Sequence, residues 1–291
     1  MASPPKLVYL ITGCSSGLGY TLAKAALTAG HTVIATSRNP SKTPDKLAEV
    51  ESLGGRWATL DVSSPSLEAQ FRETILPVGG KIDVLINNAG IGRIAIVEDI
   101  QLDVARDVFE TNFWGLVRLT KLAVAAMRAQ GGGTIVNVGS ETSLSPKPLT
   151  SIYSASKGAV DGFTVALAAE VAPFNIRVLL VTPGGIRTPF VENGATGGGG
   201  TSLREEYRGT PAEFVLGVML EPANFHVDPH KAAEVIIHAV DGTGPFERTG
   251  RGFVRLPLGG ETLAGLESRI GELRGALDGF GDVAKSVDFG G

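Results

Sequence analysis

The chain has 291 residues, of which 26 are lysine or arginine and 30 are aspartate or glutamate, so its formal net charge is −4. A chain of this length can fold around one hydrophobic core, and we expect a single domain over residues 1–291. It contains no block of like charges long enough to bind a nucleic-acid backbone or an anionic lipid surface, which argues against both partners.

The cysteine and histidine content gives no sign of a disulfide or a metal site. Cys14 is the only cysteine of the chain and has no partner within it. His226 and His230 could share a helical face, but no cysteine or paired carboxylate accompanies them, so we expect no metal. The first apolar run, residues 7–11, is too short for a signal sequence or a membrane span. We therefore expect a cytoplasmic protein.

Seven short apolar runs alternate with longer amphipathic segments along the chain. Their residues are continuously apolar instead of alternating, which is typical of parallel strands that helices cover on both faces. The pattern predicts a doubly wound α/β fold with a mostly parallel, seven-stranded sheet. The runs cover residues 7–12, 32–36, 57–62, 84–90, 134–140, 176–184 and 253–259.

Helical spacing of apolar residues predicts helices over 17–29, 100–129 and 153–171. A further helix is expected to begin at Asp228 and Pro229, because aspartate can cap the first turn and proline fits it, and to run to about Val240.

Residues 190–227 interrupt this alternation of strands and helices. A glycine-rich stretch, 193–200, precedes a patchily apolar segment, 207–220. Long loops of this kind are often active-site lids, so we expect a mobile insertion that covers the substrate.

The last 31 residues, 261–291, are predicted to form a helical extension. After Gly260, leucines and an isoleucine recur at three- and four-residue spacing and form one apolar stripe. We expect this stripe to dock on the protein's own core instead of forming a coiled coil, because it covers barely two heptads. The stripe consists of Leu263, Leu266, Ile270, Leu273 and Leu277.

The first strand run leads into the sequence Thr-Gly-Cys-Ser-Ser-Gly-Leu-Gly and then into a helix. Glycines in this position let backbone N–H groups approach a pyrophosphate at the N-terminus of a helix. The alternative is a structural turn without a ligand. The candidate phosphate-binding residues are Gly13, Ser15, Ser16, Gly17, Leu18 and Gly19.

The end of the second strand run indicates which dinucleotide would bind. NAD-binding folds usually end this strand with an acidic residue that binds the ribose 2′-hydroxyl. Here the end carries Ser37 and Arg38 and no carboxylate, and a guanidinium can pair with a 2′-phosphate. We therefore predict NADP(H), with a merely solvated Arg38 as the alternative.

Tyr153 and Lys157 lie four residues apart in the predicted helix 153–171, so both side chains are expected on one face. A free tyrosine has a pKa near 10 and needs a nearby cation to exchange protons at neutral pH. Lys157 is expected to supply that charge.

The glycine loop, the Tyr-x-x-x-Lys pair and Ser140, thirteen positions before Tyr153, together resemble the short-chain dehydrogenase/reductase family. The resemblance covers roughly residues 7–260 and implies a Rossmann-type domain. It departs from the family at Gly139, where a first serine is usual.

This resemblance implies further coenzyme-binding positions. Asp61 and Val62 should lie beside the adenine, and Asn88, Ala89 and Gly90 should line the adenosine side of the cleft. Ordinary turn chemistry is the alternative for these residues. Pro183, Gly184, Ile186 and Thr188, with the intervening backbone, should hold the carboxamide of the nicotinamide.

The resemblance also implies four catalytic residues. Tyr153 would be the general acid, Ser140 would bind the substrate oxygen, and Lys157 would hold the ribose hydroxyls of the coenzyme. Asn112 would complete a proton relay through a structural water, with plain hydrogen bonding in the core as the alternative.

The expected function is NADPH-dependent reduction of a ketone or aldehyde. The alternatives are an alcohol dehydrogenase working oxidatively at the same site, a reductase of enoyl or imine groups, and a non-catalytic protein that senses NADP(H). The substrate should have an apolar portion, because residues 91–94, residues 141–149 and four apolar side chains are expected to wall its pocket. These four are Phe190, Phe214, Val215 and Leu216.

The resemblance finally implies a homodimer or homotetramer in which helices 100–129 and 153–171 pair between subunits. Exposed side chains at Phe163 or Leu167 would suit that contact.

Overall fold

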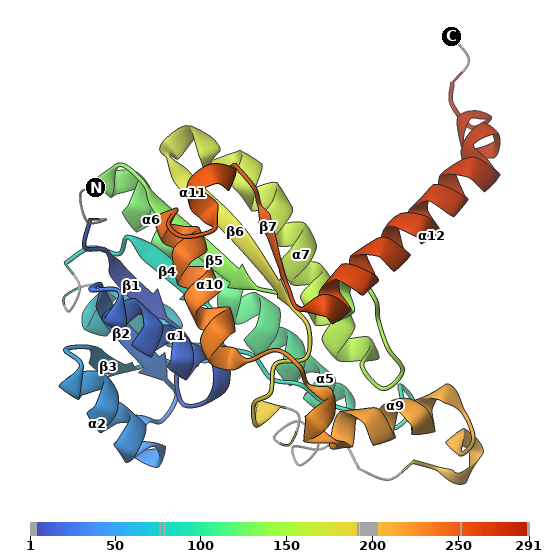
Figure 1. Cartoon of the computed structure of the whole chain (residues 1–291), viewed down its shortest axis with the longest axis horizontal. Helices are drawn as coiled ribbons and strands as arrows, with labels where there is room; N and C mark the ends of the chain where they lie inside the picture. Colours follow the sequence, from blue (N-terminus) through green and yellow to red (C-terminus); the bar gives the residue numbers. More distant parts are fainter. Residues whose placement is uncertain are drawn as a thin grey trace.

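A seven-stranded sheet forms the centre of the computed structural model, which describes residues 5–75, 77, 80–190, 192, 203–250 and 252–289. The strand order is β3-β2-β1-β4-β5-β6-β7, and all neighbouring strands run parallel (Figure 1). The doubly wound α/β prediction is confirmed. The strands are β1 Val8–Ile11, β2 Thr32–Ser37, β3 Arg56–Thr59, β4 Val84–Asn87, β5 Gly133–Val138, β6 Ile176–Pro183 and β7 Arg255–Leu258.

Two hydrophobic cores form because successive side chains of each strand point to opposite faces of the sheet. In β1, Tyr9 and Ile11 face one core, and Leu10 faces the other. All three side chains are fully buried. This double burial explains why the strand runs are continuously apolar.

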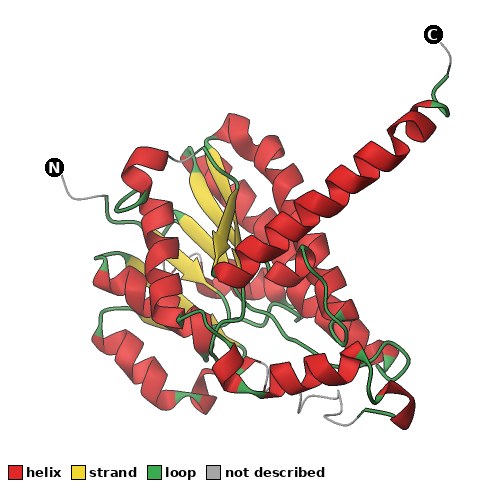
Figure 2. Ribbon diagram, turned by 45° about the vertical axis from the view of Figure 1, so that its right-hand side comes forward, coloured by secondary structure: helices red, strands yellow, loops and turns green. Residues whose placement is uncertain are grey.

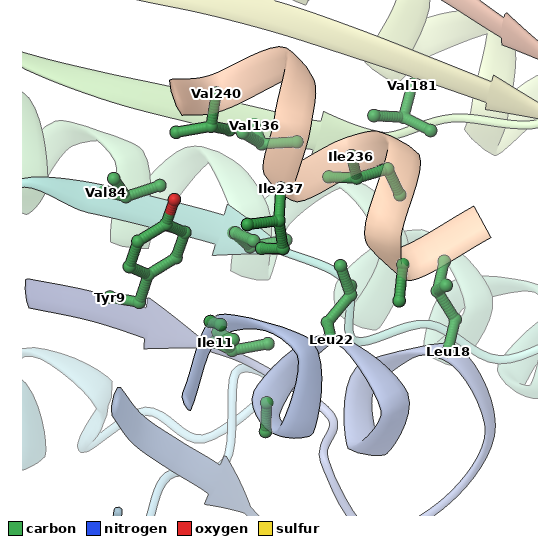
Figure 3. Close-up of a cluster of buried hydrophobic side chains, with 14 of the residues drawn as sticks. Tyr9, Ile11, Leu18, Leu22, Val84, Val136, Val181, Ile236, Ile237 and Val240 are labelled. Carbon is green, nitrogen blue, oxygen red and sulfur yellow. The ribbon is translucent and has the colours of Figure 1, made fainter. Parts of the chain in front are cut away.

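Helices α1, Gly17–Thr28, and α10, Pro229–Asp241, cover the first face of the sheet. Figure 3 shows Leu22 of α1 and Ile236 of α10 in the same cluster as side chains from the strands. The predicted start of α10 is confirmed, because the Asp228 carboxylate accepts hydrogen bonds from the N–H groups of His230 and Lys231 in its first turn.

Helices α6, Gly115–Gln130, and α7, Ser151–Val171, cover the second face. The predicted helix over 100–129 is divided. It consists of α5, Leu102–Phe109, a π-helical turn over Glu110–Trp114, and α6. The other α-helices among the described residues are α2 Pro44–Ser52, α3 Leu67–Gln70, α9 Pro211–Leu220, α11 Phe246–Thr249 and α12 Gly260–Lys285.

The expectation that the C-terminal stripe docks on the protein's own core is wrong. Thr262 and Gly265, in the first turns of α12, are buried, but the helix then projects away from the body (Figures 1 and 2). Among the apolar residues of the stripe, Ile270, Leu273 and Leu277 are all exposed. The physical reason is direction: α12 leaves the end of the edge strand β7 pointing outwards, so beyond Leu266 no described part of the chain lies under the stripe.

The exposure expected for Leu167 is also wrong. Leu167 is buried in the second core, and Phe163 is half-buried against it, because both side chains lie on the face of α7 that covers the sheet. Among the described residues, no helix is long and apolar enough to cross a membrane.

One edge of the sheet is the strand β7, which contains Pro257. Leu180 and Gly184 of the neighbouring segment donate their N–H groups to the carbonyls of Val254 and Leu258. The backbone groups of even-numbered residues along β7 therefore face β6. The odd-numbered Pro257 has its backbone nitrogen on the outer edge.

Candidate active site

A cavity of about 840 Å³ lies at the carboxyl ends of the strands, where a doubly wound sheet binds its ligands. Most of the predicted site residues line it. Three do not: Gly19, Asp61 and Asn112. The lining residues among the predicted set are Gly13, Ser15, Ser16, Gly17, Leu18, Ser37, Arg38, Val62, Asn88, Ala89, Gly90, Ser140, Tyr153, Lys157, Pro183, Gly184, Ile186 and Thr188.

Close backbone approach explains the glycines of the loop between β1 and α1. Gly13 has a φ of +73°, and a Cβ on it would lie 2.8 Å from the Ala89 Cα. A Cβ on Gly19 would lie 2.3 Å from the Gly13 carbonyl oxygen and 2.5 Å from Asn88 Nδ2. These distances are too short for a real side chain, so this loop and the one after β4 can meet only through glycine.

Thr12 joins these two loops, a role that the sequence prediction missed. Its hydroxyl accepts hydrogen bonds from the N–H groups of Asn88 and Ala89, each at 3.0 Å. In return, Asn88 Nδ2 donates to the Thr12 carbonyl at 2.9 Å. The Asn88 amide therefore helps to hold the two loops together, and its contact with the coenzyme stays a prediction.

The end of β2 presents a cation to the cavity. Arg38 is exposed, lines the cavity and has no ion pair among the described residues. Ser37 is buried, and its hydroxyl accepts a hydrogen bond from Trp57 Nε1 at 3.0 Å. A second cation that was not predicted, Lys46, donates to the Ser15 carbonyl at 3.0 Å.

Asp61 performs turn chemistry beside the cavity. Its carboxylate accepts hydrogen bonds from the backbone N–H and the hydroxyl of Ser63, at 3.0 and 2.7 Å. The neighbouring Val62 lines the cavity and is buried. Contact of either residue with an adenine stays a prediction.

Ser140, Tyr153 and Lys157 meet at one end of the cavity. Ser140 follows β5, and its hydroxyl is hydrogen-bonded to Tyr153 and accepts a hydrogen bond from the Thr142 hydroxyl at 3.0 Å. Tyr153 lies in the first turn of α7, with Phe190 against its ring at a centroid distance of 5.8 Å. Lys157 Nζ donates to the Val138 carbonyl at 2.8 Å.

The pKa of Tyr153 differs from the expectation. Burial raises it to about 12; the hydrogen bond from Ser140 lowers it in part, and the nearby Glu141 carboxylate raises it further. The Lys157 ammonium is not among the causes of this pKa shift, and its Nζ lies 5.9 Å from the centroid of the tyrosine ring. Burial lowers the pKa of Lys157 to about 8. The phenol is therefore protonated at neutral pH.

Asn112 is buried in the π-helical turn behind the site. Its side-chain oxygen accepts from the Ile91 N–H at 2.8 Å, and its Nδ2 donates to the Ile91 carbonyl and to the Ser156 hydroxyl. A Cβ on Gly90 would lie 3.2 Å from Asn112 Oδ1 and 3.7 Å from Lys157 Nζ, so Gly90 separates the two groups. Direct hydrogen bonds account for this asparagine, and the water relay stays a prediction.

The segment after β6 is held from two sides. The Gly185 N–H donates to the Glu261 carboxylate of α12 at 3.0 Å, and the Arg187 N–H donates to the Val227 carbonyl at 3.0 Å. A Cβ on Gly17 would lie 3.2 Å from the Thr188 side chain, so this segment adjoins the glycine loop. The sequence prediction missed Glu261, because nothing in the sequence indicates that α12 begins beside the cavity.

One part of the cavity wall is apolar, as expected. Phe190, Phe214 and Val215 line it, but Leu216 does not. Leu216 instead packs in a small core with Ile94. The glycine-rich stretch 193–200, part of the predicted lid, lies outside the described residues.

Charged side chains also line the cavity. Lys147 Nζ lies 2.6 Å from a carboxylate oxygen of the buried Glu141. Arg93 lines the cavity as well and donates to the Gly92 carbonyl at 2.7 Å. The sequence prediction included both segments as pocket walls but did not foresee the ion pair.

Comparison with known proteins agrees with this geometry. The model of the short chain dehydrogenase family matches residues 7–197. The "Oxidoreductase claN" of Passalora fulva is 38% identical over 209 residues, which are 72% of this chain and 93% of the relative. A crystal structure of a short-chain dehydrogenase from Streptomyces avermitilis has a TM-score of 0.83 and 32% identity, and covers 98% of this chain and 100% of its own.

Two similar ketoreductase structures contain different coenzymes. A variant of the actinorhodin polyketide ketoreductase with NADPH has a TM-score of 0.71 and 31% identity, covering 90% of this chain and 99% of its own. The 3-ketoacyl-(acyl-carrier-protein) reductase of Brucella melitensis, with NADH, has a TM-score of 0.71 and 26% identity, covering 90% and 100%. Similarity alone therefore leaves both nicotinamide coenzymes open.

Proposed function

The chain belongs to the short-chain dehydrogenase family, and we propose that it reduces a ketone or aldehyde to an alcohol with NADPH. One observation carries the proposal. A single cavity joins the glycine loop and Arg38 at one end to Ser140, Tyr153 and Lys157 at the other. This arrangement gives an elongated dinucleotide and a small carbonyl compound adjacent places.

The residues of this cavity fit a dinucleotide phosphate. The loop before α1 is free of side chains at Gly13 and Gly17, so its N–H groups and the helix N-terminus can approach a pyrophosphate. Arg38 has no carboxylate partner among the described residues and is free to pair with a 2′-phosphate. When bound, NADPH would supply the hydride.

The chain's own groups then manage the proton and the developing negative charge. Tyr153, protonated at neutral pH, donates its phenolic proton to the substrate oxygen. The Ser140 hydroxyl donates a hydrogen bond to the same oxygen. The Lys157 ammonium, one helical turn from Tyr153, stabilises the phenolate that remains.

The substrate side favours a molecule with an apolar portion. Phe190, Phe214 and Val215 form an apolar wall, and the Glu141–Lys147 ion pair lies beside the reacting end. Ketoreductases among the similar structures support the choice of a carbonyl substrate. A homo-oligomer through α6 and α7, and a cytoplasmic location, also stay predictions.

The test is a panel of ketones and aldehydes, followed by loss of NADPH absorbance. Replacing Tyr153 with phenylalanine removes the proton donor, and we expect turnover to fall by about 10²–10⁴-fold. Tyr20→Phe, which removes a hydroxyl outside the cavity, is the matched control and should keep its rate. Unchanged turnover in Tyr153→Phe, on any substrate of the panel, would overturn the proposed mechanism.

An oxidative alcohol dehydrogenase is the nearest alternative, because the same residues serve both directions. The raised pKa of Tyr153 favours reduction, since a protonated phenol is a donor and not a base. Rates in both directions at neutral pH decide between them. Faster oxidation of an alcohol than reduction of its ketone, at saturating coenzyme, would favour the alternative.

A further inference from the structure

The outer part of α12 exposes large apolar side chains to solvent. Beyond Leu266, which is half-buried, Ile270 is 64% exposed, Leu273 53%, Leu277 62% and Phe280 66%. Figures 1 and 2 show that the helix extends freely from the body. Exposed apolar patches of this kind mark surfaces that bind another macromolecule.

Intrinsic helix propensity does not explain why this segment is helical. It contains Gly271, Gly275, Gly279 and Gly281, and each glycine costs about 1 kcal/mol relative to alanine. An isolated helix with such a composition is marginal in water. Its stability therefore needs a partner that buries the apolar side chains.

The apolar residues follow a strict heptad. From Leu263 to Ala284, within α12, the spacing alternates between three and four residues without a break, and each position of the stripe is apolar. The repeat thus spans about three heptads, not the two that the leucines alone indicate, because Phe280 and Ala284 continue it. A seam at these positions is the pattern of a two-helix coiled coil, and the exposed Val283 lies beside it.

We propose that α12 pairs in antiparallel orientation with α12 of a second copy of this chain. In one register, Leu263 lies level with Phe280 of the second copy, Leu266 with Leu277, and Ile270 with Leu273. Each apolar residue from Leu263 to Phe280 then meets another. Because the interface is two-fold symmetric, every contact occurs twice.

Charges beside the stripe select this orientation. In a parallel pair, Arg269 would face Arg274 of the second copy, because flanking residues five positions apart meet in that arrangement. In the antiparallel register above, Glu267 instead lies beside Arg274 of the second copy. Among the described residues, neither Glu267 nor Arg274 has an ion-pair partner within its own chain, whereas Arg269 pairs with Glu272.

The antiparallel pair also keeps the two bodies apart. The paired stretch from Leu263 to Phe280 is about 25 Å long, with one body at each end. The contact is separate from the α6 and α7 faces, so it can operate alone or add to an assembly formed there.

Sedimentation of the full chain over a range of concentrations tests the pairing. We expect Leu273→Asp to halve the mass of the assembly. Arg274→Glu should weaken association about tenfold, because it places a glutamate beside Glu267 of the other copy in both symmetric contacts. Lys285→Glu makes the same charge change on the outer face and is the matched control. The double exchange of Glu267→Arg with Arg274→Glu restores the complementary pair and should restore the mass.

Cross-linking tests the orientation directly. An equal mixture of Glu267→Cys chains and Arg274→Cys chains should form a disulfide-linked dimer, whereas neither chain alone should do so. The native thiol does not interfere, because Cys14 is buried and burial raises its pKa to about 12. Circular dichroism should show that Leu273→Asp loses helix content while the body stays folded.

Three outcomes would overturn the proposal. One is a parent chain whose mass equals that of Leu273→Asp at every concentration. Another is disulfide formation between Arg274→Cys chains, with no disulfide between a Glu267→Cys chain and an Arg274→Cys chain in the mixture. The third is that the parent binds phosphatidylcholine vesicles and Leu273→Asp does not, while the assemblies of the two proteins have the same mass. This result would make the stripe a lipid-binding surface.

Discussion

Tyr153 and Lys157 lie one helical turn apart, and burial changes the acid strength of both side chains. It raises the pKa of Tyr153 to about 12 and lowers that of Lys157 to about 8, since each shift favours the neutral form. The neutral phenol suits a proton donor. The ammonium, however, has to stay protonated to stabilise the phenolate, so Lys157 limits the working pH range.

The proposed reduction should therefore slow in alkaline solution. Lys157 is protonated below pH 8 and neutral above it, so kcat/KM for NADPH should be constant up to about pH 8. It should then fall about tenfold per pH unit, as for a single ionisation of the free enzyme. A pH profile from 6 to 10 checks this. The remaining activity of Lys157→Met should lack the decline near pH 8, and a flat profile in the parent would contradict the assignment.

For single residues, the sequence predicted where the side chains lie better than it predicted their pKa values and hydrogen bonds. The spacing of Ser140, Tyr153 and Lys157 was sufficient to place all three at one end of the cavity. The direction of the Tyr153 pKa shift could not be predicted, because it depends on enclosure and on Glu141, which the fold brings near. Thr12 was missed because a threonine at a strand end gives no sign of the two N–H groups that it binds.

At the scale of elements, the junction between β1 and α1 depends on contact with the loop after β4. Gly19 is the tightest point, since its α-carbon faces the Gly13 carbonyl and the Asn88 amide. The glycine is in a helix, where alanine would otherwise be preferred. Steric contact, and not helix propensity, therefore determines this position.

Gly19→Ala should destabilise the protein by about 3 kcal/mol and weaken coenzyme binding, because the added methyl group would separate the two loops. Gly217→Ala in α9 is the control. No atom lies within 4 Å of its added Cβ, so helix propensity should stabilise the protein by up to about 1 kcal/mol. Urea unfolding measures both changes. Equal stabilities of the two variants would show that the close approach is not needed.

The helices that the sequence predicted wrongly depend on tertiary context. The division of residues 100–129 at a π-helical turn accompanies the hydrogen bonds of Asn112 to Ile91 and Ser156, which lie in other elements. The helical spacing of α12 was predicted correctly, but periodicity carries no information on the direction in which a helix leaves the sheet. The apolar stripe therefore predicted that one side of α12 is buried, but it did not predict which surface covers that side.

For the whole molecule, the cavity joins segments that follow all seven strands, so its occupation should stabilise the complete fold. Continuous apolar runs predicted the strands because helices cover both faces of the sheet. The same topology places the predicted loops together at one edge, which explains why most of the predicted site residues share one cavity.

NADPH at a hundred times its dissociation constant should raise the unfolding free energy by about 2.7 kcal/mol. For a domain of this size the melting temperature should rise by about 5 °C. NADH at the same concentration should give a much smaller rise, since Arg38 has no phosphate to bind. Scanning calorimetry with both coenzymes measures the difference, and Arg38→Ala should remove it. Equal rises in the parent would contradict the NADP(H) assignment.

Pro257 in β7 has a consequence for the solubility of the protein. An exposed edge strand is a template on which another molecule can add a strand through backbone hydrogen bonds. The nitrogen of Pro257 faces that edge and carries no hydrogen, so the row of donors is interrupted in the middle of a four-residue strand. At this side of the sheet the folded protein should therefore resist the edge-to-edge association that leads to aggregation.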